Sequence, residues 1–90
     1  MSDYQLIVTP PARRALSKTL PEPIATAAIE FLTGSLVVAP HRVGKPPRFE
    51  MAGVWAARRG TYRVLYRINE HSHEVIVLRV EHRRDAYRPL

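Results

Sequence analysis

The chain has 90 residues, of which 46% are hydrophobic, so it can form one small domain around a single core. Its formal net charge is +6, with twelve arginines against two lysines, which favours anionic partners such as phosphate, although charge alone does not establish nucleic-acid binding. It has no cysteine, which excludes disulfides and a thiolate nucleophile, and no apolar run approaches the roughly 20 residues of a membrane span. The N-terminus does not read as a signal peptide, so we expect a cytoplasmic location.

The first part of the chain predicts a strand followed by two helices. Residues 4–9 alternate as in a strand, and Thr9 followed by two prolines predicts a helix start that the threonine hydroxyl caps. The first helix is expected over residues 12–20, before a proline-rich break at residues 21–23. The second helix is predicted from apolar residues at helical spacing, namely Ile24, Ala27, Ala28, Phe31, Leu32 and Leu36.

Residues 38–48, VAPHRVGKPPR, are rich in proline and glycine, and we interpret them as a solvated loop with three basic residues. A short strand is expected at residues 49–51, a turn at Gly53 and another strand at residues 54–58. The order of one strand, two helices and then consecutive strands indicates an α+β fold. We therefore expect a single domain over residues 1–90, with two N-terminal helices on one face of a twisted, mostly antiparallel sheet of four to five strands.

The most informative segment is a predicted hairpin with two chemically different faces. Residues 62–68 and 74–82 each alternate, and the polar residues 69–73 read as the turn between them. The predicted register pairs Ile68 with Glu74, Tyr66 with Ile76, Val64 with Leu78, Tyr62 with Val80, Arg67 with Val75, Arg63 with Arg79, and Arg59 with Arg83. One face would be apolar and the other lined by arginines. Like charges directly opposite each other cost stability, so facing arginines indicate an anionic ligand.

An arginine-lined face suits phosphoryl chemistry on RNA. When a 2′-hydroxyl attacks the adjacent phosphorus, charge builds on the non-bridging oxygens, and preorganised guanidinium groups stabilise that charge. A phenol or an imidazole can move protons, which makes Tyr87 and His82 candidates. Tyr87 can instead stack on a base or anchor the C-terminal tail, and His82 can be a histidine at the edge of the core. His71 and His73 lack an evident third ligand, so we expect no metal site.

Two runs, RRGTYRVLYRI and VIVLRVEHRRDAY, resemble the C-terminal signature of the RelE/ParE toxin superfamily. The opening strand, the run TPPARRALSKTLP into the first helix and the run RVGKPP before the middle strands agree, so the resemblance covers nearly the whole chain. It implies the toxin of a type II toxin–antitoxin pair. In the RelE branch it further implies a ribosome-dependent endoribonuclease that cuts messenger RNA in the ribosomal A site through the RNA's own 2′-hydroxyl, with no metal and no cofactor.

The resemblance also implies the site residues. The implied catalytic residues are Arg58, Arg63, Arg83 and Tyr87, with His82 as a possible acid or base. The expected contacts to RNA phosphates are Arg59, Arg67, Arg79 and Lys45. The archetype of the family has a lysine two positions before its first basic site residue, where this chain has Ala56. This departure leaves the proton acceptor open, since arginine stays protonated.

Two alternatives remain open at this point. The ParE branch shares the fold but inhibits DNA gyrase; Ala56 favours it, whereas Arg63, Arg83 and Tyr87 favour the RelE branch. A purely structural RNA- or protein-binding module fits the charge but does not explain the run HRRDAY. The expected partners are an acidic RelB-like antitoxin, the ribosome and messenger RNA, with operator DNA bound only through the antitoxin complex and no membrane.

Overall fold

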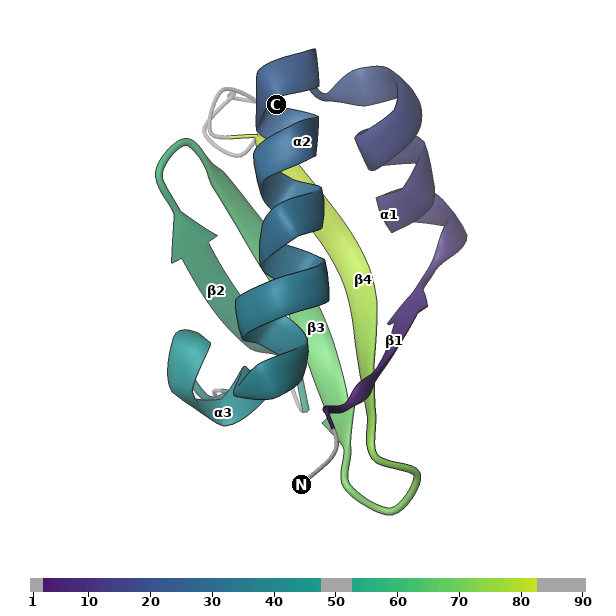
Figure 1. Ribbon diagram of the computed structural model, residues 1–90, viewed down its shortest axis with the longest axis vertical. Coiled ribbons are helices and arrows are strands. Elements are labelled where there is room, and N and C mark those ends of the chain that lie inside the picture. The colour runs from purple at the N-terminus through teal and green to yellow at the C-terminus, as the bar shows by residue number, and fades with distance from the viewer. Residues whose placement is uncertain (1–2, 48–52, 83–90) are drawn as a thin grey trace.

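The structure, a computed structural model, describes residues 3–47 and 53–82. The elements in chain order are β1 (Gln5–Val8), α1 (Pro10–Arg14) with the π-helical segment η1 (Ala15–Thr19), α2 (Glu22–Phe31) with the π-helical segment η2 (Leu32–Leu36), α3 (Pro40–Val43), β2 (Trp55–Arg59), β3 (Tyr62–Asn69) and β4 (Glu74–His82). The helices α1 and α2 lie across one face of the sheet (Figure 1), which confirms the predicted α+β class. In the described ranges no helix has the length and apolar character needed to cross a bilayer.

The described strands form one sheet in the order β1–β4–β3–β2. β1 is parallel to β4, while the β2–β3 and β3–β4 pairings are antiparallel, so the sheet is mostly antiparallel as predicted. β1 pairs with residues 74–77 of β4 and does not extend along residues 78–82. The strand expected at residues 49–51 lies outside the described ranges.

The β3–β4 hairpin has the predicted turn but not the predicted register. The observed pairs are Tyr62 with His82, Arg63 with Glu81, Val64 with Val80, Tyr66 with Val77, Arg67 with Ile76 and Ile68 with Val75. Next to the turn the prediction was wrong by one residue. Leu78 then forms a β-bulge, an extra residue in β4, and beyond it the prediction was wrong by two residues. Around the bulge, β4 has apolar residues on both of its faces. The sequence therefore has no alternation of apolar and polar residues there that would define which side chains face the core.

Thr9 contacts the bulge directly. Its backbone N–H donates to the carbonyl of Val77 at 3.1 Å. Its hydroxyl lies 2.8 Å from the same carbonyl and 3.0 Å from that of Leu78. The predicted role of this hydroxyl as a helix cap is therefore wrong, and α1 has no side-chain cap. The sequence correctly placed the helix start, but the hydroxyl binds the neighbouring strand instead.

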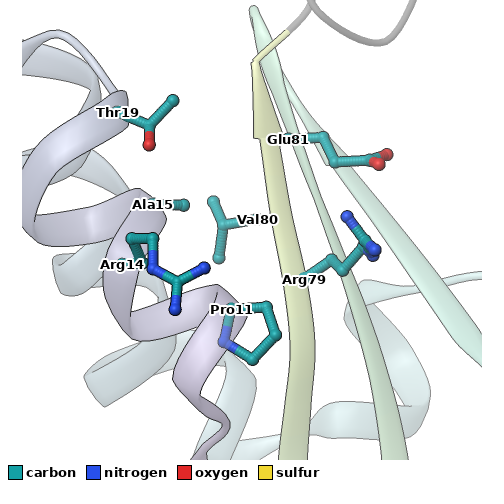
Figure 2. Close-up of a pocket in the computed structure, with 7 residues that line it drawn as sticks. All are labelled: Pro11, Arg14, Ala15, Thr19, Arg79, Val80 and Glu81. Atoms are coloured by element: carbon teal, nitrogen blue, oxygen red, sulfur yellow. The ribbon is translucent and has the colours of Figure 1, made fainter.

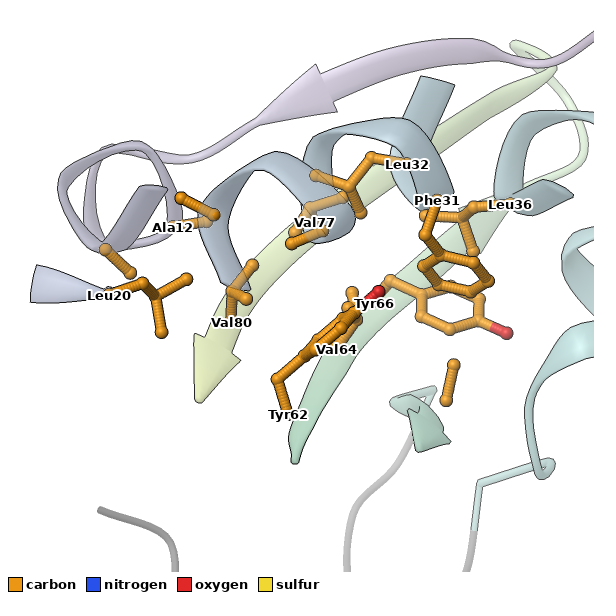
Figure 3. Packing of buried hydrophobic residues seen from close by; sticks show 14 of the residues in the cluster. Ala12, Leu20, Phe31, Leu32, Leu36, Tyr62, Val64, Tyr66, Val77 and Val80 are labelled. Atoms are coloured by element: carbon orange, nitrogen blue, oxygen red, sulfur yellow. The ribbon is translucent and has the colours of Figure 1, made fainter. Parts of the chain in front are cut away.

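The core lies between the helices and the covered face of the sheet (Figure 3). The buried side chains of α2 and η2 are Ala25, Ala28, Phe31, Leu32 and Leu36, so Ala25 takes the place that the sequence had assigned to the exposed Ala27. The sheet contributes the buried residues Ala57, Tyr62, Val64, Tyr66, Val75, Val77 and Val80. This burial directs the alternate residues of β2, β3 and β4, including Arg58 and Arg63, to the other face.

Part of the predicted loop at residues 38–48 is helical. α3 forms one turn beginning at Pro40, which is buried, and the hydroxyl of the fully buried Tyr66 donates to the Pro40 carbonyl at 2.6 Å. Burial raises the pKa of Tyr66 to about 12, so its phenol stays protonated as a donor. Just after α3, Lys45 forms a backbone bridge with Ala56, with N–O distances of 2.8 and 3.3 Å. The helix and the bridge together fix this segment, residues 40–45, against β2 and β3.

A second set of contacts joins α3 to the β3–β4 turn. One carboxylate oxygen of Glu70, in the turn, lies 2.5 Å from His41 Nε2. The other oxygen accepts a hydrogen bond from the Tyr4 hydroxyl at 2.7 Å. Tyr4 also stacks on His73 with ring centroids 3.8 Å apart, and His41 meets the Trp55 ring edge-on at 5.3 Å. The Tyr4 hydrogen bond, assisted by the charge of His41, lowers the pKa of Glu70.

We predict that Gly44→Ala destabilises the protein. A Cβ at this position would overlap the Tyr66 hydroxyl and lie 3.1 Å from the Ala56 carbonyl, so either the buried tyrosine or residues 40–45 must move. Overpacking of this kind costs about 1–3 kcal/mol in the free energy of unfolding. Urea denaturation measures this cost. Gly34→Ala is the matched control, since nothing lies within 4 Å of its Cβ, and it should change stability by no more than about 1 kcal/mol. Equal stability of the two variants would contradict the prediction.

We predict that Glu70→Gln lowers the melting temperature in a pH-dependent way. A carboxyl whose pKa is lower in the folded state stabilises the fold above the ordinary value of 4.5, and this contribution is lost as the pH falls through the folded-state pKa. The difference in melting temperature between wild type and variant should therefore be present above pH 4.5 and shrink towards pH 3. The exposed Glu30→Gln on α2 is the control. A difference that stays constant from pH 7 to pH 3 would contradict this prediction.

Candidate functional site

Cationic side chains gather in a pocket between residues 40–45 and the strands β2 and β3. The pocket has a volume of about 370 Å³ and is lined by Arg42, Val43, Gly44, Lys45, Ala56, Arg58 and Arg63. We call it the basic pocket. Among the described residues that line it, the ionisable side chains are all arginine or lysine. This arrangement creates a positive potential suited to a phosphate group.

Arg58 and Arg63 are direct neighbours across β2 and β3. The sequence had predicted two facing arginines, but with Arg79 as the partner of Arg63, and that pairing is wrong. On β4 the residue opposite Arg63 is Glu81, whose carboxylate accepts a hydrogen bond from Arg63 Nε at 2.6 Å. The three side chains thus form a row of two cations and one anion across the sheet. The two facing arginines predicted from the sequence had indicated an anionic ligand. In the structure, Glu81 supplies part of that negative charge.

The structure brings three of the predicted site residues together in the basic pocket, namely Lys45, Arg58 and Arg63. It adds Arg42, which the sequence analysis had left within a solvated loop. The available signal was the basic composition of residues 38–48, but the sequence did not predict the helical turn that places Arg42 beside the strands. Two predicted catalytic residues, Arg83 and Tyr87, lie outside the described residues.

The remaining predicted residues do not line the basic pocket. Arg59 projects towards the helices, and its guanidinium carbon lies 4.6 Å from the centre of the Phe31 ring. Arg67 is exposed and lies on the same face of β3 as Arg63, further along the strand. On β4 the residue opposite Arg67 is Ile76. The predicted contacts of Arg59 and Arg67 to RNA phosphate are therefore separate from the pocket.

His82 lies opposite Tyr62 at the end of the β3–β4 pairing. The Tyr62 hydroxyl is 3.4 Å from the Ala27 carbonyl of α2, so this pair is on the face of the sheet that the helices cover. Residues directly opposite each other on antiparallel strands point to the same face. The structure thus separates His82 from Arg63, which points to the other face.

Arg79 lines a different, smaller hollow of about 270 Å³ between β4 and the first helix. Figure 2 shows Arg79 and Glu81 extending from β4 away from the helix, whereas Val80 points towards Ala15. Arg14 contributes a second cation to this hollow from the helical side. Arg79 and Arg63 therefore line different hollows, although Arg79 lies two residues from Glu81, the partner of Arg63, on the same face of the sheet.

Comparison with known proteins agrees with this fold. Residues 6–87 match the family described as ParE toxin of type II toxin-antitoxin system, parDE. The chain is 53% identical over 85 residues to Toxin RelG of Mycobacterium tuberculosis, covering 94% of this chain and 97% of that protein. It is 44% identical over 91 residues to Toxin RelE of the same organism, covering 98% and 93%.

Among solved structures, the chain is similar to the toxin–antitoxin complex RelBE2 from Mycobacterium tuberculosis. The TM-score is 0.86 at 51% sequence identity, and the match covers 91% of this chain and 100% of that chain. Sequence and structure thus lead to the same group of proteins. The chain belongs to the RelE/ParE superfamily and is a toxin of a type II toxin–antitoxin system.

Proposed function

We propose that this toxin is a ribosome-dependent endoribonuclease that cuts messenger RNA in the ribosomal A site. The observation that carries the proposal is the basic pocket, which places Arg58 and Arg63 side by side and adds Arg42 and Lys45 from the neighbouring segment. The 44% identity to a protein named Toxin RelE supports the same branch. The site of action would be the cytoplasm, where the ribosomes are.

In the proposed reaction the RNA supplies its own nucleophile. The 2′-hydroxyl attacks the adjacent phosphorus, a 2′,3′-cyclic phosphate forms, and the 5′-oxygen of the next nucleotide leaves with a proton. Arg58 and Arg63 stabilise the charge that develops on the non-bridging oxygens, and Arg42 and Lys45 hold neighbouring phosphates. By the family resemblance, Arg83 and Tyr87 complete the site. Arginine cannot accept a proton at neutral pH, and Lys45 has no acceptor in its ammonium form, so we assign the described pocket an electrostatic role rather than that of a general base.

Because the pocket is proposed to act through electrostatics alone, the reaction is expected to depend on the ribosome. Electrostatic stabilisation is effective only when the scissile phosphate is held with the 2′-hydroxyl in line for attack. Messenger RNA in the A site is held in a defined conformation, whereas free RNA is not. The proposed neutralising partner is an acidic RelB-like antitoxin that covers the basic pocket, and operator DNA would be bound only through that complex. The RelBE2 complex, in which a relative 51% identical is a toxin bound to an antitoxin, supports this partner.

Inhibition of DNA gyrase is the second candidate function. The matched family description names ParE, and Ala56 stands where the RelE archetype has a lysine. One pair of assays separates the two functions. Primer extension on a translated message detects cuts within the A-site codon, and a DNA-cleavage assay detects gyrase trapped on DNA. Cuts without trapped gyrase support the RelE branch, and the converse supports the ParE branch.

We predict that the purified toxin cuts translated messenger RNA and leaves naked RNA of the same sequence nearly intact. The cations that line the described pocket suit phosphate binding but offer no proton acceptor in their charged forms, so we expect the ribosome to position the substrate. Primer extension with and without initiating ribosomes measures the difference. Efficient cutting of free RNA at the same toxin concentration would contradict ribosome dependence.

We predict that Arg63→Ala and Arg58→Ala each slow single-turnover cleavage on programmed ribosomes. The loss of one preorganised donor to a developing oxyanion costs about 10²–10³-fold in rate. Arg13→Ala is the matched control, because it removes one exposed arginine from the helical side of the molecule. Melting temperatures show whether each variant is folded. A folded Arg63→Ala protein that binds ribosomes and cuts at the wild-type rate would rule out the proposed role.

We predict that cleavage persists when transition metals are removed. The nucleophile belongs to the RNA, and the cations of the pocket can stabilise the transition state without a metal ion. The assay uses a chelator selective for transition metals and retains the magnesium that ribosomes need. Loss of cutting that added zinc or manganese restores would contradict the prediction.

A further inference from the structure

The ion pair of Arg63 and Glu81 involves a particular edge of the guanidinium. Glu81 Oε1 accepts from Nε, the nitrogen nearest the backbone, at 2.6 Å. With Nε occupied, the two Nη groups at the end of the side chain can still bind a phosphate in a two-pronged manner. Arg63 also lines the basic pocket. Glu81 thus binds one edge of the guanidinium while the opposite end is available to the pocket.

We infer that Glu81 is a positioning residue for Arg63, which it orients so that its Nη groups face the scissile phosphate. The inference rests on the proposed function and names a residue that the family resemblance did not supply. Glu81 holds the substrate-binding cation without touching the substrate. Its effect on the reaction would therefore pass through the orientation of one guanidinium.

The neighbours of Arg63 explain why orientation is needed. Arg58 lies directly opposite on β2, and two like charges at this spacing repel each other. An unrestrained Arg63 would relieve that repulsion by rotating its guanidinium away from the pocket. Contact with Glu81 at Nε limits this rotation. The arginine and glutamate side chains are 39% and 25% exposed, so solvent screens the pair less than it screens a fully exposed one.

The register of the sheet supports a specific placement of this carboxylate. Arg63 and Glu81 face each other only because Leu78 adds one residue to β4. If the register beside the turn continued without the bulge, Val80 would face Arg63. The bulge is in turn bound by Thr9 through the Val77 and Leu78 carbonyls. The local irregularity of the strand therefore brings a carboxylate to the arginine of the site.

Two other roles for Glu81 make different predictions. It could serve only to neutralise charge and stabilise the fold, or it could mask Arg63 and weaken phosphate binding. Glu81→Gln keeps the length and an acceptor oxygen but removes the charge. Glu81→Asp keeps the charge but is one methylene shorter, and so cannot reach Nε in the same geometry. Comparison of these two variants distinguishes an effect of the length of the side chain from an effect of its charge.

The first measurement is single-turnover cleavage on programmed ribosomes at saturating toxin. If Glu81 positions Arg63, Glu81→Asp and Glu81→Ala should cut about tenfold to a hundredfold more slowly, whereas Glu81→Gln should lose much less. Binding to ribosomes should change little in all three variants. Glu74→Gln is the matched control, because it also removes a carboxylate from β4. The Glu74 carboxylate accepts a hydrogen bond from Ser72 instead of from an arginine.

The second measurement does not depend on cleavage. In protein labelled with nitrogen-15 at arginine, the Nε–H signal of Arg63, assigned through its loss in Arg63→Lys, reports the contact with Glu81. We expect slow solvent exchange in wild type and Glu81→Gln, and fast exchange in Glu81→Asp and Glu81→Ala. Melting temperatures recorded in parallel show whether a change in rate merely follows unfolding.

The combined outcomes distinguish this inference from the proposed function. If wild type fails to cut translated message while the Nε–H signal responds as expected, the proposed function is wrong but the orientation of Arg63 by Glu81 stands. If Glu81→Asp is more active than Glu81→Gln, charge rather than reach matters and the inference is wrong. Faster cutting or tighter binding of inorganic phosphate by Glu81→Gln would show masking and overturn it as well.

Discussion

The β-bulge at Leu78, together with its contacts to Thr9, determines which side chains of β4 face which side of the sheet. On one side of the bulge Val75 and Val77 are buried, and beyond it Val80 is buried. If the same residues continued as a regular strand with no bulge, Val80 would point to the outer face and Glu81 towards the helices. A bulge usually costs part of the regular hydrogen-bond ladder. Here the backbone and hydroxyl of Thr9 bind the carbonyls next to it, which offsets that loss.

The basic pocket depends on a second constraint, which is the close approach of residues 40–45 to β2 and β3. Tyr66 crosses from the core to the Pro40 carbonyl, and the absence of a side chain at Gly44 makes room for its hydroxyl. Glu70, with Tyr4 and His41, joins α3 to the far end of the β3–β4 hairpin. As a result, the cations from this segment are held by both the core and the turn. A flexible loop in their place would lose conformational freedom each time it ordered around a ligand.

The sequence predicted the element order and the α+β class because hydrophobic periodicity and proline positions are local signals. It failed on the register of β4, where residues 75–80 are all apolar except Arg79 and either parity could face the core. It also failed on α3, since the buried environment of Pro40 and the Tyr66 hydrogen bond depend on residues far away in the chain. For the site, Arg58 and Arg63 could be named from the resemblance, and Lys45 from the basic residues of its segment. Arg42 and Glu81 could not, because their places depend on the helical turn and the bulge.

The charge arrangement of the site follows from these constraints. Arg58 and Arg63 are held as neighbours by the β2–β3 register, so repulsion between them is built into the fold and is reduced by Glu81 on one side only. A phosphate in the basic pocket would reduce the repulsion from the other side. An anion that carries more charge in the transition state than in the ground state gains more from this arrangement. The same reasoning fits the proposed acidic antitoxin, since any carboxylate placed in the pocket would compete for the same cations.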